Sequence, residues 1–307
     1  MRRLERRRGT TGVTLAVLCA LAIVPPLAFA GGPPPPPDRI FREDGLKYVK
    51  TRVMAAPAED FAGVQVPCGG ERWHVVGGGA DVVDGFAPAV YMLASHPFDF
   101  DEAFGGDPDL KPDDGWEVFV REDAGPDLKV DAWAICEKRG VRYRRAAKDP
   151  DPGQGRTVKA SCRGRNLIGG GFSIAPVLVN EVSVSVPYDG ADPGSRPDDG
   201  WTVHGFNDPS AIMGIVEVHA TCVRDGDLSY PKKAASAPSM LTTRSPRARC
   251  GRAGSVTGGG GSVGSGHIVE SHPIDGGDRG QAPDDGWRST LVVAAGFRAK
   301  TFAVCSG

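Results

Sequence analysis

Hydrophobic and polar residues alternate with a period of two in several stretches of this chain. Residues 182–186 and 216–222 both follow the pattern, which is typical of antiparallel strands with one face turned to a core. Cys136 and Cys222 share the apolar face of their segments with small residues, including Ala134 and Ala220. No apolar stripe of helical period continues over three turns. The pattern therefore predicts an all-β protein in which helices are minor.

The segment Pro-Asp-Asp-Gly-Trp occurs three times and ends at Trp116, Trp201 and Trp287. Around each copy the same landmarks appear in one order: a tyrosine, a cysteine, a glycine run, Ser-x-Pro, the tryptophan segment and a second cysteine. Such recurrence predicts three tandem modules, at residues 45–139, 140–227 and 228–307. The other landmarks are Tyr48, Tyr143 and Tyr230; glycines 77–79, 169–171 and 258–261; and the serines Ser95, Ser185 and Ser271.

The chain has seven cysteines, six of which follow the N-terminal segment. Six thiols allow fifteen pairings, and the repeat selects one disulfide for each module. Closing loops of this length stabilises a fold by roughly 4 kcal/mol per bridge in the chain-entropy model. The predicted pairs are Cys68 with Cys136, Cys162 with Cys222, and Cys250 with Cys305.

Each module is best interpreted as a small antiparallel β-sandwich closed by its disulfide. The alternative is a closed pseudo-threefold β assembly, in which three similar sheets share one central core. In the repeated turn, proline and the aspartates favour a tight turn, and glycine is expected to take a positive φ. The tryptophans are expected in the core. The glycine runs indicate a bulge or a close backbone approach.

The first thirty residues have the layout of an export signal. Five arginines lie within residues 1–8, an apolar run covers residues 13–27, and Ala28-Phe29-Ala30 fits a cleavage site. Residues 31–44, with five consecutive prolines, are predicted to be an extended tether. The sequence thus predicts an extracellular protein with no membrane span after cleavage. The alternative is anchoring through an uncleaved signal, although Pro25 and Pro26 would interrupt the spanning helix.

Charge and composition narrow the class of protein. Residues 31–307 carry 31 basic and 37 acidic residues, a net charge of −6, which is unfavourable for general binding of nucleic acid. The chain contains 43 glycines and 26 prolines with only 7% aromatic residues, which favours many turns and thin cores.

The succession of cysteine, Gly-Gly-Gly strand, Ser-x-Pro, tryptophan strand and cysteine resembles β modules of uncharacterised secreted actinobacterial proteins. The resemblance covers residues 48–305. It implies a β fold and an extracellular setting, and it implies no catalytic residue.

Candidate chemistry is sparse, and the sequence predicts no catalytic residue, no metal site and no cofactor. The aspartate pairs at 113–114, 198–199 and 284–285 are interpreted as turn residues. Asp99, Asp101, Glu102, Asp107 and Asp109 could hold calcium but lack EF-hand spacing. The Gly-x-Ser-x-Gly match at 260–264 lies in a predicted strand, where a nucleophile elbow does not form. The six histidines show no metal-ligand spacing and are interpreted as surface residues: His74, His96, His204, His219, His267 and His272.

Trp133, His219 and Phe302 stand three residues before the last cysteine of each module, on the face opposite the core. They are the candidate binding surface, and the alternative is packing between modules. The basic segment 138–148 is interpreted as a solvated linker, and the alternative is a site that attracts an anionic wall polymer.

The leading functional hypothesis is a noncatalytic secreted or cell-surface protein with a binding or structural role. Its modules would raise avidity for a cell-wall polymer, a glycan or a protein. The alternatives are a secreted hydrolase with a site between modules and an inert surface stalk.

Overall fold

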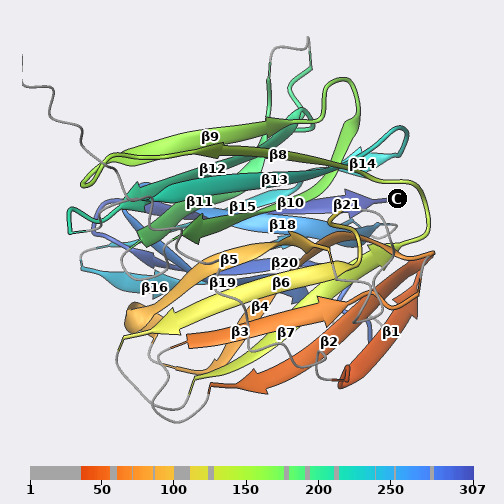
Figure 1. Ribbon diagram of the computed structural model, residues 1–307, viewed down its shortest axis with the longest axis horizontal. Helices are drawn as coiled ribbons and strands as arrows, with labels where there is room; N and C mark the ends of the chain where they lie inside the picture. The colour runs from red at the N-terminus through yellow and green to blue at the C-terminus, as the bar shows by residue number, and fades with distance from the viewer. Residues whose placement is uncertain are drawn as a thin grey trace, which may run out of the picture. The chain divides into compact units, whose positions relative to one another are not determined.

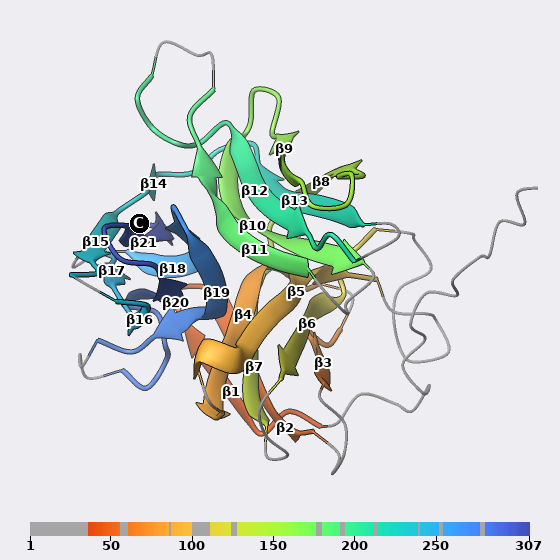
Figure 2. The same cartoon turned by 90° about the vertical axis from the view of Figure 1, so that its left-hand side faces the viewer.

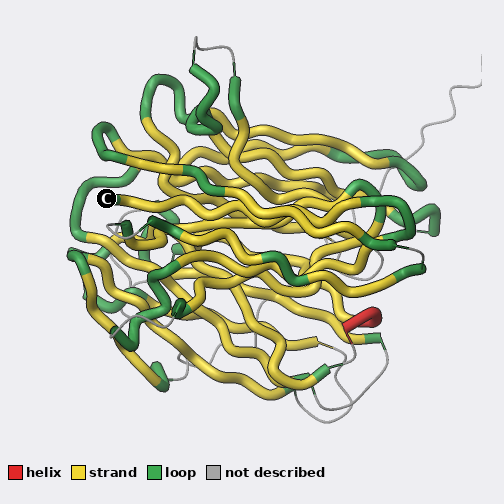
Figure 3. Tube along the Cα trace, turned by 180° about the vertical axis from the view of Figure 1, so that it is seen from behind, coloured by secondary structure: helices red, strands yellow, loops and turns green. Residues whose placement is uncertain are grey.

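The computed structural model describes residues 36–307 except 56–60, 71, 86, 100–110, 124–127, 176–179, 191–193, 211–213, 239, 252–253 and 277–279. The predicted export signal and most of the calcium candidates therefore lie outside the described residues. Figure 3 shows that the described chain consists mainly of strands joined by loops and turns. The one helical element in these ranges is a 3-10 turn of three residues, η1 (Ala87–Ala89), so no described helix is long enough to cross a membrane.

The strands form three antiparallel sheets, here named A, B and C (Figures 1 and 2). The all-β prediction is confirmed. Sheet A has the order β1 (Arg39–Glu43), β2 (Leu46–Met54), β7 (Lys129–Glu137), β4 (His74–Asp84), β19 (Gly266–Ile274), β20 (Gly286–Val293) and β16 (Thr242–Arg244), with β17 (Arg247–Arg249) also on β20. Sheet B has the order β3 (Phe61–Pro67), β6 (Gly115–Glu122), β5 (Val90–Phe98), β10 (Asn166–Ala175), β13 (Ile215–Val223) and β8 (Arg142–Lys148). Sheet C has the order β14 (Leu228–Ser229), β21 (Arg298–Ser306), β18 (Ser255–Val263), β11 (Asn180–Tyr188), β12 (Gly200–Asn207) and β9 (Gly155–Ser161), with β15 (Lys232–Ser236) also on β21.

Every module places strands in two sheets. Module 1 (residues 45–139) has β2, β7 and β4 in sheet A and β3, β6 and β5 in sheet B. The two layers enclose a core, where Trp116 of β6 packs on Gly78 of β4. The modules therefore have the predicted sandwich layers. Each carries the predicted disulfide: Cys68–Cys136, Cys162–Cys222 and Cys250–Cys305.

Strand pairs also join each module to the next. Module 1 meets module 2 (residues 140–227) through β5 and β10, module 2 meets module 3 (residues 228–307) through β11 and β18, and module 3 returns to module 1 through β19 and β4. Each of the three sheets stays open; β16 and β17 share one edge of sheet A, and β14 and β15 share one edge of sheet C. The modules thus form a closed ring of sandwiches, and one contiguous apolar cluster contains residues of all three.

The glycine runs allow these junctions to form. A Cβ on Gly79 would clash with the carbonyl oxygen of Ser271 across the junction, and a Cβ on Gly78 would clash with the Trp116 ring. A bulge precedes this pair, between Val75 and Gly77. Both predicted roles, bulge and close approach, are present. The same contacts recur at Gly170 with Trp201, Gly171 with Ser95, Gly259 with Trp287, and Gly260 with Ser185.

The repeated tryptophans and tyrosines each have a fixed hydrogen-bond partner. The indole nitrogen of Trp116 donates to Ser95 Oγ at 3.0 Å within module 1. The hydroxyl of Tyr48 donates to the carbonyl of Val256 in module 3 at 2.9 Å. The tyrosines therefore tie each module to a neighbour. Equivalent bonds join Trp201 to Ser185, Trp287 to Ser271, Tyr143 to Val75, and Tyr230 to Leu167.

The repeated aspartates accept hydrogen bonds in the turn through their backbone and their side chains; the carboxylates of Asp199 and Asp285 accept from the backbone nitrogens of Gly190 and Gly276. The carbonyl of Asp114 accepts from Cys68 N at 2.8 Å, and that of Asp113 accepts from Val75 N at 2.9 Å. The expected positive φ is present at one of the three turn glycines, Gly200, where φ is 158°, and not at Gly115 or Gly286. Gly115 instead lies so close to Val66 that a Cβ would be 2.5 Å from its carbonyl oxygen, and Gly200 and Gly286 lie equally close to the neighbouring strand.

Two segments differ from the sequence interpretation. Residues 39–43, inside the predicted tether, form β1 and pair with β2 through a tight turn, in which Asp44 and Gly45 have φ of 48° and 82°. The basic segment is not a linker, because residues 142–148 form β8 and pair with β13. Arg145 there forms an ion pair with Glu217.

Candidate functional site

A row of polar side chains crosses five neighbouring strands of sheet A. Strand register places Arg52 of β2 opposite Asp131 of β7, and Asp131 opposite Asp81 of β4. Continuing the Ala80–Ser271 pairing by one residue places Asp81 opposite Glu270 of β19. Glu270 in turn pairs with Thr290 of β20. Three carboxylates therefore stand in succession across the junction of modules 1 and 3.

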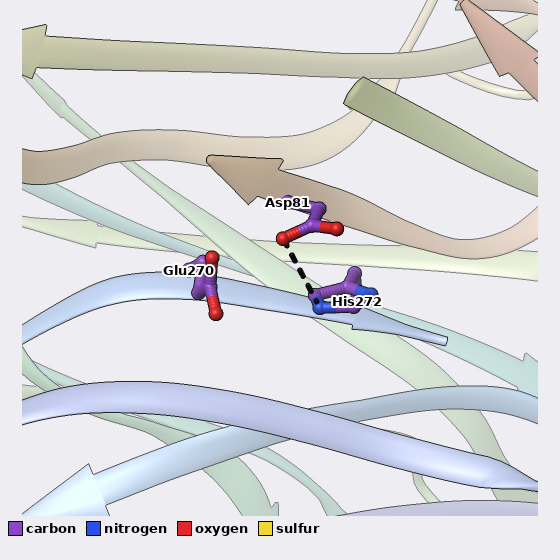
Figure 4. Close-up of side chains that lie close together, drawn as sticks. All are labelled: Asp81, Glu270 and His272. Atoms are coloured by element: carbon purple, nitrogen blue, oxygen red, sulfur yellow. Dashed lines mark ion pairs between the residues drawn. The ribbon is translucent and has the colours of Figure 1, made fainter. Parts of the chain in front are cut away.

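The adjacent row adds an imidazole and a cation. His272 lies two residues from Glu270 and pairs with Arg288 of β20. Nη2 of Arg288 contacts Asp81 Oδ1 at 2.9 Å and Glu270 Oε1 at 3.0 Å. Figure 4 shows His272 turned toward Asp81, and its Nε2 lies 3.6 Å from Asp81 Oδ1. We call Asp81, Glu270 and His272 the acidic junction cluster.

Burial sets the charge state of this cluster. Glu270 and His272 are only 6% and 5% exposed. Burial raises the pKa of Glu270, with the negative charge of Asp81 adding to the effect and Thr290 and Arg288 opposing it. Burial also lowers the pKa of His272 to about 4, so this imidazole is neutral at pH 7. The Thr290 hydroxyl donates to Glu270, and Val82 N donates to its other oxygen at 3.1 Å.

Sheet B carries a different polar group at its junction. His96 of β5 and His219 of β13 stack with their ring centroids 4.8 Å apart. His96 Nε2 lies 3.2 Å from Glu117, and His219 Nε2 lies 2.6 Å from Glu217. Burial alone would lower the pKa of His96, but Glu117 outweighs it and raises that pKa. Burial lowers the pKa of His219 to about 4.

The three residues of the predicted binding surface lie on three different sheets. Trp133 is in sheet A, His219 in sheet B and Phe302 in sheet C. Lys50 Nζ lies 5.2 Å from the Trp133 ring, and the Phe41 ring is 6.4 Å away. Trp133 shares its sheet face with the acidic junction cluster, separated from His272 by Gly79. The structure therefore does not bring the three residues together into one surface.

The interpretation of the histidines as surface residues is wrong for several of them. His219, His267 and His272 are 7%, 6% and 5% exposed, because each faces a junction that the sequence does not reveal. No catalytic or metal motif predicted these positions. Ser262 of the Gly-x-Ser-x-Gly match lies within β18, paired with Val184.

His267 should make the fold sensitive to acid. It stacks on Tyr91 at 4.3 Å, and burial lowers its pKa to about 4. Below about pH 6.5 His267 is protonated in the unfolded chain, but in the folded chain it stays neutral down to about pH 4. Acidification across this range therefore lowers the free energy of unfolding by up to about 3 kcal/mol through this residue alone. His267→Phe keeps the stacking and removes the proton.

Urea unfolding at pH 7 and pH 4.5 measures this effect. The difference in unfolding free energy between His267→Phe and wild type should move in favour of the variant by about 2–3 kcal/mol on acidification. If the difference in unfolding free energy between the variant and wild type is the same at both pH values, His267 is not held neutral in the fold.

No known family model matches this chain, and a search of curated proteins found no match either. The fold and the side-chain chemistry therefore carry the functional argument.

Proposed function

We propose that this chain is an exported, noncatalytic protein that serves as a binding or structural scaffold outside the cell or on its surface. Three disulfides support an oxidising compartment. The export-signal layout of residues 1–30 and the resemblance to secreted modules point the same way. In this proposal a spacer follows the signal, and residues 45–139, 140–227 and 228–307 are repeats of one module.

The proposal is carried by one observation: the residues that recur in all three modules have structural partners, whereas the polar groups that differ between modules lie at the junctions. The cysteines, junction glycines, tryptophan–serine pairs and tyrosine hydroxyls recur in all modules, and each has a structural partner. Active sites are single, so a residue repeated three times for packing is a poor candidate for catalysis. Polar groups that do not recur lie on sheets A and B at the junctions, which suits a scaffold that displays different chemistry on each sheet.

One small interior cavity among the described residues is consistent with recognition on the surface. It is about 10 Å³, room for about one water molecule, and small-molecule sites are typically about 300–1,000 Å³. Its lining comes from all three modules, including Gly78, Gly170 and Gly259. This space cannot hold a substrate.

Retention on immobilised protein tests the proposal. The oxidised chain should retain at least one component from a cell-wall polymer fraction, a glycan panel or a set of exported proteins, and the reduced, alkylated chain should not. Saturable binding without turnover supports a scaffold. Retention of nothing from any fraction, or catalytic turnover of a retained component, would overturn it.

A second candidate, a hydrolase with a site between modules, is favoured by the position of the acidic junction cluster between modules 1 and 3. Hydrolysis by general acid–base catalysis can use two carboxyl groups, and Asp81 and Glu270 lie on neighbouring strands at this junction. Loss of a hydrolytic activity in Glu270→Gln, at unchanged stability, would select this alternative. An inert stalk is less suited to the fold, because direct pairing of β4 with β19 returns the last module to the first.

A further inference from the structure

The acidic junction cluster has the geometry of an incomplete metal site. One ligand atom from each of Asp81, Glu270 and His272 lies within 4.8 Å of the others. Asp81 comes from module 1, and Glu270 and His272 come from module 3 (Figure 4). The two strands that carry them are hydrogen-bonded neighbours, which fixes the spacing of the three side chains.

His272 is oriented as metal-binding histidines are. Its Nδ1 is 2.9 Å from the carbonyl oxygen of Pro273, so Nδ1 carries the hydrogen and Nε2 keeps its lone pair. Nε2 is buried, has no hydrogen-bond partner among the described residues, and faces Asp81. Backbone carbonyls commonly hold metal-ligating imidazoles in this way. A buried, unpartnered nitrogen is costly unless a ligand binds it.

A cation between the carboxylates of Asp81 and Glu270 would offset their mutual repulsion. Like charges on directly opposite residues of paired strands destabilise a sheet. Arg288 now lies against both carboxylates, and its side chain is 24% exposed, so it can swing out to solvent. Arg288 is therefore a built-in competitor for any bound metal.

The scaffold itself does not require this cluster. At the junction of sheet B the positions of Asp81 and Glu270 are taken by Ser173 and Ala94, which pair with each other. At the junction of sheet C they are taken by Ser262 and Val184. Only the junction of sheet A has two opposed carboxylates.

We propose that Asp81, Glu270 and His272 bind one Zn²⁺ ion between β4 and β19, locking module 3 to module 1. One imidazole and two carboxylates, with water in the fourth position, form a normal zinc ligand set. Ligand atoms about 2 Å from a tetrahedral ion lie roughly 3.3 Å apart. The cluster must therefore contract slightly as Arg288 withdraws. Ca²⁺ prefers six to eight oxygen ligands, so it should bind far more weakly.

Isothermal titration of the purified, chelator-treated protein with Zn²⁺ tests this site. Wild type should bind one ion with high affinity, and His272→Gln and Glu270→Gln should each weaken binding at least tenfold. His96→Gln is the matched control, because His96 holds the same position in module 1 and its Nδ1–H donates to the carbonyl oxygen of Pro97 in the same way. This control should keep the wild-type affinity.

The direction of the change in zinc affinity in Arg288→Gln is the most discriminating result. Removal of the competing cation should tighten zinc binding about tenfold, which a misfolded variant would not do. Zinc should raise the melting temperature of wild type and raise that of His272→Gln by clearly less at the same zinc concentration. Absence of saturable binding, equal binding by His272→Gln, or weaker binding by Arg288→Gln would each overturn the site.

Discussion

Gly79→Ala is expected to lower the free energy of unfolding by more than about 3 kcal/mol, at the upper end of overpacking costs. The added Cβ would clash with the Ser271 carbonyl oxygen, which is backbone and cannot rotate away. The strands β4 and β19 would have to separate, and their pairing joins module 3 to module 1. Equilibrium unfolding in guanidinium chloride, followed by tryptophan fluorescence, measures the loss.

The matched control is Gly140→Ala, because a Cβ at Gly140 would have no atom of a described residue within 4 Å. It should change stability by less than about 0.5 kcal/mol. Gly171→Ala and Gly260→Ala should cost as much as Gly79→Ala, since each faces a serine carbonyl across its own junction. If Gly79→Ala behaved like the control, the close approach at the junction would not exist.

Removal of any one disulfide should produce the other large effect. The paired cysteines are separated by 68, 60 and 55 residues, and closure of such loops stabilises the fold by roughly 4 kcal/mol in the chain-entropy model. Because that term depends only weakly on loop length, the three double Cys→Ala variants should lose similar amounts. Denaturant unfolding of each variant gives the comparison.

Strand pairing between the modules also predicts how the whole protein unfolds in these variants. Loss of Cys162–Cys222 should destabilise all three modules together, because module 2 pairs with both neighbours. Limited proteolysis should then cut modules 1 and 3 at the same denaturant concentration as module 2. Selective cutting of module 2, with the others still protected, would contradict a shared core.

The sequence predicted the fold class because its strongest signals are local or repeated. Alternation of apolar residues locates β11 and β13, and repetition pairs the six cysteines correctly. The hairpin of β1 and β2 was missed, although Asp44-Gly45 is a recognised hairpin signal. The proline-rich stretch before it favoured a tether.

Pairing between modules was harder to foresee. The tyrosine landmarks were visible, but nothing in the chain indicates that Tyr48 donates to Val256 some two hundred residues away. The burial of His267 is equally hard to predict, because the Tyr91 ring on which it stacks belongs to another module. Contacts of this kind depend on the order in which sandwiches meet, and local patterns carry no information about it.

The acidic junction cluster could not be found from spacing either. Asp81 lies in the first module and His272 in the last, so their separation along the chain matches no ligand motif. One weak signal was available, since aligning the repeats shows that Asp81 and Glu270 replace uncharged residues of the other copies. Charge that appears in a single copy of a repeated scaffold is therefore a useful indicator of function.

Three sandwiches share a core through a closed ring of strand pairs. Differential scanning calorimetry of the oxidised protein tests it most directly, by comparing the calorimetric and van't Hoff enthalpies of unfolding. The ring predicts a single transition in which the two enthalpies agree. Three resolved transitions, or a van't Hoff enthalpy near one third of the calorimetric value, would mean that the modules unfold independently.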